Sequence, residues 1–82
     1  MNKKLIKFSE QLDVMKEELD EMIGACEEKQ SAIEDRAAEH DRDLTDSEQE
    51  KYDALDEKIQ ELRDALENIE YAFDHICTII EE

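Results

Sequence analysis

Residues 52–80, YDALDEKIQELRDALENIEYAFDHICTII, decide the fold. Apolar side chains recur here in an unbroken alternation of three and four residues, which is the spacing of a coiled-coil seam along one face of a long helix. We therefore expect a helix over about 46–80. Its seam consists of Tyr52, Leu55, Ile59, Leu62, Leu66, Ile69, Phe73, Ile76 and Ile80.

The first half of the chain carries a similar seam, which weakens toward its end. Polar residues interrupt the pattern at Lys29, Arg36 and His40, although Ile33 restores it once. The spacing predicts a helix over about 3–42. The seam expected there consists of Leu5, Phe8, Leu12, Met15, Leu19, Met22, Cys26 and Ile33.

A turn over about 43–46 separates the two helices. Thr45 is followed three residues later by Glu48, the spacing of a capping box that starts a new helix. If the helices run antiparallel, paired residues have numbers that add up to 88, so that Cys26 meets Leu62. Under this register the long side chains of Lys29 and Arg36 lie along Ile59 and Tyr52, and Arg36 stacks on the Tyr52 ring.

These patterns predict an all-α fold in which two long helices form an antiparallel coiled-coil hairpin. The whole chain, residues 1–82, is then a single helical-hairpin domain. The same spacing would also suit a parallel dimer of long helices, but the capped short loop favours the hairpin. Zero Pro and one Gly argue against the many turns of a β or α/β fold, and 82 residues leave no room for a two-domain enzyme.

Charge narrows the class of partner. Twenty-six acidic and ten basic residues give a net charge of −16, which disfavours direct binding to nucleic acid or to an anionic membrane. The sequence has no run of 18 apolar residues and no signal peptide, and its two cysteines are not spaced as a secreted disulfide scaffold. We expect a cytoplasmic protein with reduced thiols.

Additional apolar residues widen the stripe on both helices. A single two-helix seam buries little surface, so this wider stripe predicts either a homodimeric four-helix bundle or docking to a partner protein. Under the second interpretation the chain is a structural or assembly adaptor. The residues of the stripe are Ile23, Ala25, Ala32, Ala37, Ala65, Ala72 and Ile79.

Residues capable of catalysis or metal binding are poorly arranged. His40 and His75 lie near opposite ends of the expected hairpin, and the spacing of Asp74, His75 and Cys77 does not converge on one ion. The acidic segment that begins at Asp41 fails as a calcium loop, because residue 46 is not Gly and residue 52 is not Glu. We expect no catalytic residue, no metal and no cofactor, and hence no enzyme.

Acidic stripes opposite the seam are the remaining clue to function. Neighbouring carboxylates on one helix face lie about 5–6 Å apart at their Cβ atoms, a scale similar to phosphate spacing in nucleic acid. The stripes predict binding to a basic nucleic-acid-binding protein, against the simpler interpretation that the charge serves solubility. The candidate binding residues are Asp53, Glu57, Asp64, Glu67 and Asp74, followed by Glu17, Asp20 and Glu27.

The segment Arg42–Leu55, RDLTDSEQEKYDAL, resembles the inter-helix segment of the N-terminal scaffolding region in many tailed-phage major capsid proteins. There, too, a basic residue, Leu-Thr, acidic residues and an aromatic-Asp-x-Leu motif join two acidic helices. That region is normally followed by a protease site and a capsid shell domain, neither of which occurs in residues 1–82.

The resemblance implies a phage or prophage setting and a small assembly or accessory protein. By type, the chain is also similar to small acidic phage inhibitors of host defence, such as anti-restriction and anti-CRISPR proteins. The first hypothesis is therefore a phage-type inhibitor that occupies the basic groove of a host defence protein such as a CRISPR effector, in the host cytoplasm. The alternative is the scaffolding-like adaptor that acts through the apolar face.

Overall fold

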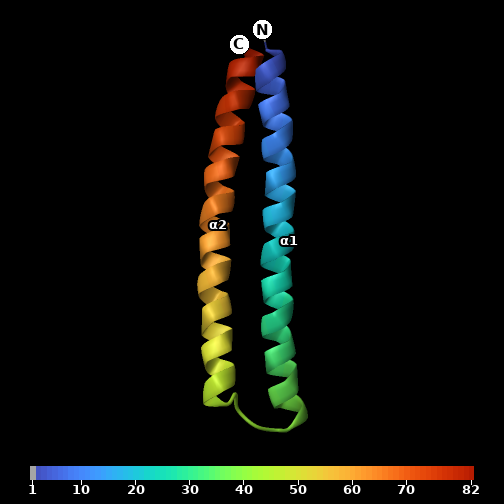
Figure 1. Ribbon diagram of the computed structural model, residues 1–82, viewed down its shortest axis with the longest axis vertical. Coiled ribbons are helices and arrows are strands. Elements are labelled where there is room, and N and C mark those ends of the chain that lie inside the picture. The colour runs from blue at the N-terminus through green and yellow to red at the C-terminus, as the bar shows by residue number, and fades with distance from the viewer. Residues whose placement is uncertain (1) are drawn as a thin grey trace.

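A computed structural model describes residues 2–82 as a helical hairpin (Figure 1). Helix α1, Lys3–Glu39, and helix α2, Asp46–Glu81, lie side by side and run in opposite directions. The rod measures 61 × 16 × 14 Å, with the turn at one end and both chain ends at the other. Among the described residues there is no strand, and no helix is sufficiently long and apolar to cross a membrane.

Helix α2 turns its predicted seam toward α1. All nine seam residues are buried or half-buried, and Ile59, at 8% exposed, is the deepest. Leu55, Leu62 and Leu66 pack around a small core that Ile59 forms with Ile23 and Cys26 of α1. The period of apolar residues therefore predicted the inward face of this helix correctly.

The seam predicted for α1 is wrong at three of its eight positions. Phe8, Met15 and Met22 are exposed, with 47%, 44% and 46% of their surface in contact with solvent. The inward positions are instead the residues that follow each of them, together with the leucines, Cys26 and Ile33 that were predicted. The corrected inward residues are Ser9, Lys16, Ile23, Gln30 and Ala37, which are buried or half-buried.

Relative to the predicted seam, α1 is rotated so that the next residue faces inward. Two basic residues at the turn end explain this rotation. The predicted seam would place Lys29 and Arg36 between the helices, whereas the observed seam places Gln30 and Ala37 there. An unpaired charge between packed helices is costly, while a small apolar residue and a hydrogen-bonded amide are tolerated. The rotation is unfavourable at the open end, where Phe8 and Met15 are exposed and the half-buried Ser9 and Lys16 take the inward positions.

Contacts between the helices lie near the expected register of 88: the residue numbers add up to 82 and 86 for the two contacts of Gln30, and to 89 for Lys16 with Phe73. Gln30, 8% exposed, donates from Nε2 to the Tyr52 carbonyl oxygen at 3.2 Å and to Asp56 Oδ1 at 2.6 Å. Near the open end, the Lys16 ammonium lies 4.6 Å from the centre of the Phe73 ring, a cation–π contact within the seam. These contacts specify the register at both ends of the rod.

The expected stacking of Arg36 on Tyr52 is replaced by another contact. Arg36 is exposed, and the Tyr52 hydroxyl lies against Glu34 instead. Hydrogen bonding to the Glu34 carboxylate, followed by desolvation, raises the pKa of Tyr52 above its ordinary value of 10.0. The difference follows from the rotation of α1, which moves residue 36 away from the seam.

Helix α1 ends at Glu39, earlier than the expected boundary near residue 42. The Asp41 N–H donates to the Ala38 carbonyl oxygen at 3.0 Å, and the Arg42 N–H donates to the Ala37 carbonyl oxygen at 3.1 Å. This is a Schellman motif, in which the residue after the cap takes a left-handed conformation. Here that residue is Asp41, with φ of 49°. The chain thus ends a helix sharply without the glycine that usually signals such an end.

The predicted capping box at the start of α2 is confirmed. Thr45 Oγ1 accepts from the Glu48 N–H at 3.1 Å, and the Thr45 N–H donates to Glu48 Oε1 at 2.9 Å. Arg42 adds an ion pair to the same carboxylate at 2.6 Å. Hydrogen bonding from Arg42, and then from the Thr45 backbone, lowers the pKa of Glu48 to about 2. One carboxylate therefore joins the end of the loop to the start of α2.

The corrected seam predicts different effects for two neighbouring alanines. Ala37 is 5% exposed and lies between the helices, whereas Ala38 is exposed. Ala37→Glu is expected to lower the free energy of unfolding by at least about 2 kcal/mol, because it buries an unpaired charge. Ala38→Glu is expected to change it by no more than about 0.5 kcal/mol. Equal effects of the two variants in chemical denaturation would contradict this seam.

The Glu48 carboxylate predicts a specific pH dependence. Because its pKa is lowered on folding, its contribution to stability is present above its unfolded value of 4.5 and is lost as the pH falls toward about 2. The difference in Tm between the wild type and Glu48→Gln is expected to shrink over this range. The matched control is Glu50→Gln, which changes an exposed glutamate on the same turn of α2. A Tm difference for Glu48→Gln that stays constant with pH would exclude the assigned role.

Candidate protein-binding surfaces

The eight acidic residues predicted as a binding site are all exposed, but they do not form one patch. Five lie along α2 on the sides away from α1, and three lie along α1. Two of the α1 residues, Asp20 and Glu27, flank the seam. The structure therefore presents acidic stripes on several sides of the rod.

Few of these carboxylates are neutralised. Within residues 2–82 only two ion pairs between basic and acidic side chains form: Arg42 with Glu48, and Arg63 with Glu27 at 3.7 Å. Others accept hydrogen bonds from neutral groups one turn away. These contacts join Gln49 to Asp53 at 3.0 Å, Gln60 to Asp64 at 3.2 Å, and the Tyr71 hydroxyl to Glu67 at 3.3 Å. The negative charge of the stripes is therefore largely uncompensated.

One side of the inter-helix seam forms an acidic face. Its residues recur every seven positions: Asp13, Asp20, Glu27 and Glu34 on α1, and Asp56, Arg63 and Glu70 on α2. Contacts of Glu27 with Arg63 and of Gln30 with Asp56 cross the seam on this side. Asp56 and Glu70 were not among the candidate binding residues of the sequence interpretation. Their seven-residue spacing from Arg63 was the available signal, because it places them beside the seam.

The opposite side of the seam forms an acid-poor face. It also has a seven-residue repeat, and none of its ten residues is acidic. The register places each α1 residue at nearly the level of one α2 residue, beginning with Phe8 near Ile79 and ending with Arg36 near Lys51. We define this face by Phe8, Met15, Met22, Lys29 and Arg36 of α1, and Lys51, Lys58, Ala65, Ala72 and Ile79 of α2.

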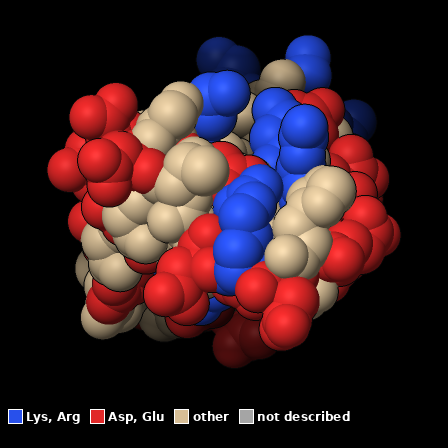
Figure 2. Space-filling model, turned by 90° about the horizontal axis from the view of Figure 1, so that it is seen from below, with Lys and Arg blue, Asp and Glu red and all other residues tan. Residues whose placement is uncertain are grey.

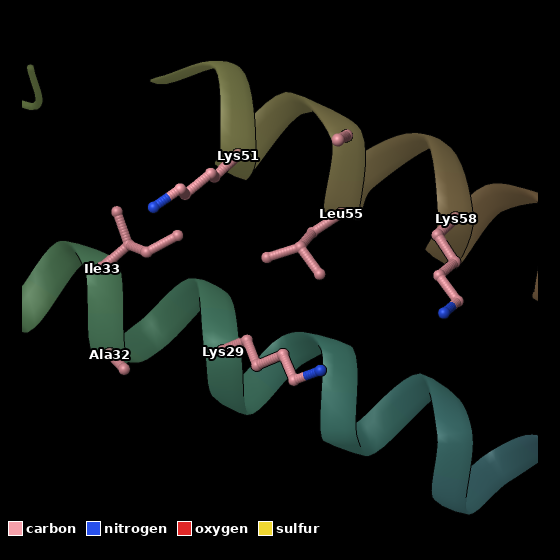
Figure 3. Close-up of a pocket in the computed structure, with 7 residues that line it drawn as sticks. Lys29, Ala32, Ile33, Lys51, Leu55 and Lys58 are labelled. Atoms are coloured by element: carbon pink, nitrogen blue, oxygen red, sulfur yellow. The ribbon is translucent and has the colours of Figure 1, made fainter. Parts of the chain in front are cut away.

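At the turn end, the acid-poor face contains an open groove of about 540 Å³. Its floor is apolar, with Ala32 and Ile33 from α1 and Ala54 and Leu55 from α2. The side chains of Lys29, Lys51 and Lys58 surround this floor (Figure 3). Seen from the turn end, Lys and Arg side chains gather in one band with acidic side chains on either side (Figure 2).

Toward the open end, the acid-poor face becomes apolar. Ile79, 49% exposed, joins Phe8, Met15 and Met22 there, and a shallow hollow is lined by Tyr71, Ala72, His75 and Ile76. Of the apolar stripe expected from the sequence, Ala65, Ala72 and Ile79 belong to this face, and Ala32 lines its groove. The prediction is wrong for Ile23 and Ala37, which are buried between the helices at 7% and 5% exposure.

The described residues show no group of three or more His, Cys, Asp or Glu side chains placed to hold a metal ion. Cys26 is buried in the core and Cys77 is half-buried on α2, and both are free thiols. The surface presents uncompensated carboxylates on several sides of the rod and an apolar and basic strip on the acid-poor face.

Comparisons with protein-family models, with curated proteins and with solved structures find no match to this chain.

Proposed function

We propose that this chain is a non-enzymatic protein-binding module that imitates nucleic acid. Its acidic helix surfaces would occupy the basic groove of a nucleic-acid-binding protein. The observation that carries the proposal is the row of exposed carboxylates along α2, from Asp53 to Asp74, which no lysine or arginine neutralises. On a rod 61 Å long, such a row presents negative charge over 22 residues of α2, at intervals of three, four or seven residues.

The net charge supports this function through its effects on stability and on association. A net charge of −16 destabilises a small hairpin by self-repulsion, and the two ion pairs relieve little of it. A partner rich in Lys and Arg would remove this repulsion on binding. It would also accelerate association and make affinity fall with ionic strength, as for nucleic acid itself.

The same proposal includes a phage or prophage origin of the chain. The resemblance of Arg42–Leu55 to the scaffolding region of phage capsid proteins favours a phage or prophage origin. A phage protein of this type would act in the host cytoplasm as an inhibitor of a defence protein, in the manner of anti-CRISPR proteins. The basic channel of a CRISPR effector is the kind of groove that a narrow acidic rod fits.

A second function is favoured by a different observation. Four large apolar side chains, Phe8, Met15, Met22 and Ile79, are 44–49% exposed on one face. Apolar surface of this kind marks protein interaction sites, so the chain would be a structural or assembly adaptor. The homodimeric four-helix bundle expected from the sequence would also use such a face.

Charge reversal along α2 tests the first function. Glu57→Lys, Asp64→Lys and Glu67→Lys are expected, together, to abolish capture of a basic nucleic-acid-binding protein from host lysate at low salt. The matched control reverses three exposed glutamates on α1, Glu10, Glu21 and Glu28, and so changes net charge equally. Circular dichroism verifies that both variants remain helical. Capture that is unchanged in the α2 variant, or lost equally in both variants, would refute a specific role for α2.

Ionic strength separates the two functions. Binding through carboxylates is expected to be lost at about 0.5 M salt and to be displaced by added DNA or RNA. Binding through the apolar residues is expected to persist at that salt concentration, because burial of apolar surface is not screened. Substituting Ala72→Glu would weaken only the second kind of binding.

A further inference from the structure

We propose that the acid-poor face is covered by a second copy of this chain, packed antiparallel to the first, so that Phe8 of each copy lies over the lysine-lined groove of the other. The result is a four-helix bundle with a twofold axis through its centre. This inference does not depend on the imitation of nucleic acid proposed above, because it concerns the side of the hairpin that carries no predicted acidic binding residue. It uses the apolar residues of the second function, and a second copy would occupy them.

The isolated hairpin exposes more surface than a compact monomer of the same mass. The chain exposes 6422 Å², whereas a compact monomer of 9.7 kDa exposes about 5,100 Å². The excess is larger than the roughly 800 Å² that each partner buries in an interface of standard size. Within residues 2–82 no side chain is fully buried, and only four hydrophobic residues are buried at all. A second hairpin on the apolar strip would supply the missing core.

Charge selects a second copy in the antiparallel orientation. Lys29, Arg36, Lys51 and Lys58 all lie at the turn end of the acid-poor face. A parallel pair would place these four cations directly against the same four cations. An antiparallel pair instead brings them to the open end of the other copy, where the acid-poor face is apolar and the cations of Lys3, Lys4 and Lys7 lie near the carboxylates of Glu10, Glu81 and Glu82. Like charges across an interface are strongly unfavourable, so the antiparallel pair is preferred.

Distances along the rod agree with this orientation. Met22 and Ala65 lie near the middle of the rod and would flank the twofold axis. Phe8 lies 14 residues from Met22 in one direction, about 21 Å, and Ile33 of the groove lies 11 residues away in the other, about 16 Å. In an antiparallel pair these two distances are measured from the same axis, and they differ by about one helical turn. Phe8 of one copy therefore reaches the groove of the other copy.

The groove suits an aromatic side chain. Its floor is formed by Ala32, Ile33, Ala54 and Leu55, and its rim by ammonium groups. A phenyl ring seated there buries apolar area while its faces meet the lysine cations. The chain already makes one such contact, between Lys16 and Phe73. Assembly through this face would also direct all eight predicted acidic binding residues outward.

The mass in solution tests the proposal directly. Sedimentation equilibrium of the full chain is expected to give twice 9.7 kDa. Met15→Glu is expected to raise the dissociation constant of the dimer by about 100-fold. The control is Val14→Glu, which places the same charge one residue away, at a side chain 52% exposed outside the acid-poor face, and should leave the dimer intact. A wild-type chain that is monomeric at about 0.1 mM would overturn the proposal.

Cysteine cross-linking tests the orientation without relying on a variant that could fail to fold. In a Cys77→Ser background, Met22→Cys is expected to form a disulfide-linked dimer readily, because this position flanks the twofold axis. Met15→Cys is not expected to do so, because its two copies lie about 21 Å apart along the rod. Cys26 is 5% exposed and should not interfere. Equal cross-linking at both positions would overturn the antiparallel arrangement, as would its absence at Met22→Cys.

Discussion

The exclusion of Lys29 and Arg36 from the space between the helices is the constraint on which the rest of the structure depends. Helix α1 offers two overlapping stripes that share its leucines, Cys26 and Ile33. Toward the open end, one contains Phe8, Met15 and Met22, and the other contains Ser9, Lys16 and Ile23. At the turn end, one stripe continues with two cations and the other with Gln30 and Ala37. Because an unpaired charge is costly in the seam, the second stripe faces α2, and its one cation, Lys16, lies over the Phe73 ring. Gln30 then specifies the register through its hydrogen bonds to Tyr52 and Asp56.

This constraint also produces the two-sided surface. Turning Gln30 inward carries Lys29 and Arg36 to one flank, where Phe8, Met15 and Met22 follow at the same seven-residue spacing. The other flank receives Asp20, Glu27 and Glu34. A chain with 26 acidic residues thus gains one long face that is almost free of them. The core and the surface are therefore determined together, by the choice of which side of α1 faces inward.

The sequence predicted the architecture well and the surface only in part. The unbroken repeat in α2 allows only one inward face, so its seam was correctly predicted. The antiparallel orientation and the capping box at Thr45 were also correctly predicted. In α1, a periodic pattern cannot choose between Met22 and Ile23, because both continue a spacing of three and four. That choice depends on charges at the other end of the helix, a tertiary effect. The α1 boundary was placed too late because Asp41 adopts a left-handed conformation that usually signals glycine.

The position of the turn near the middle of the chain has a consequence for folding kinetics. Contacts beside the Thr45 cap close short loops, whereas contacts near Leu5 and Ile80 close nearly the whole chain, and loop-closure entropy grows with length. The hairpin should therefore form from the turn outward, with Ala37 and Ile33 among the first α1 residues to pack against α2. Substitutions near the turn would slow folding, while those at the open end would mainly accelerate unfolding. The residues that orient α1 are thus also among the first to meet their partners.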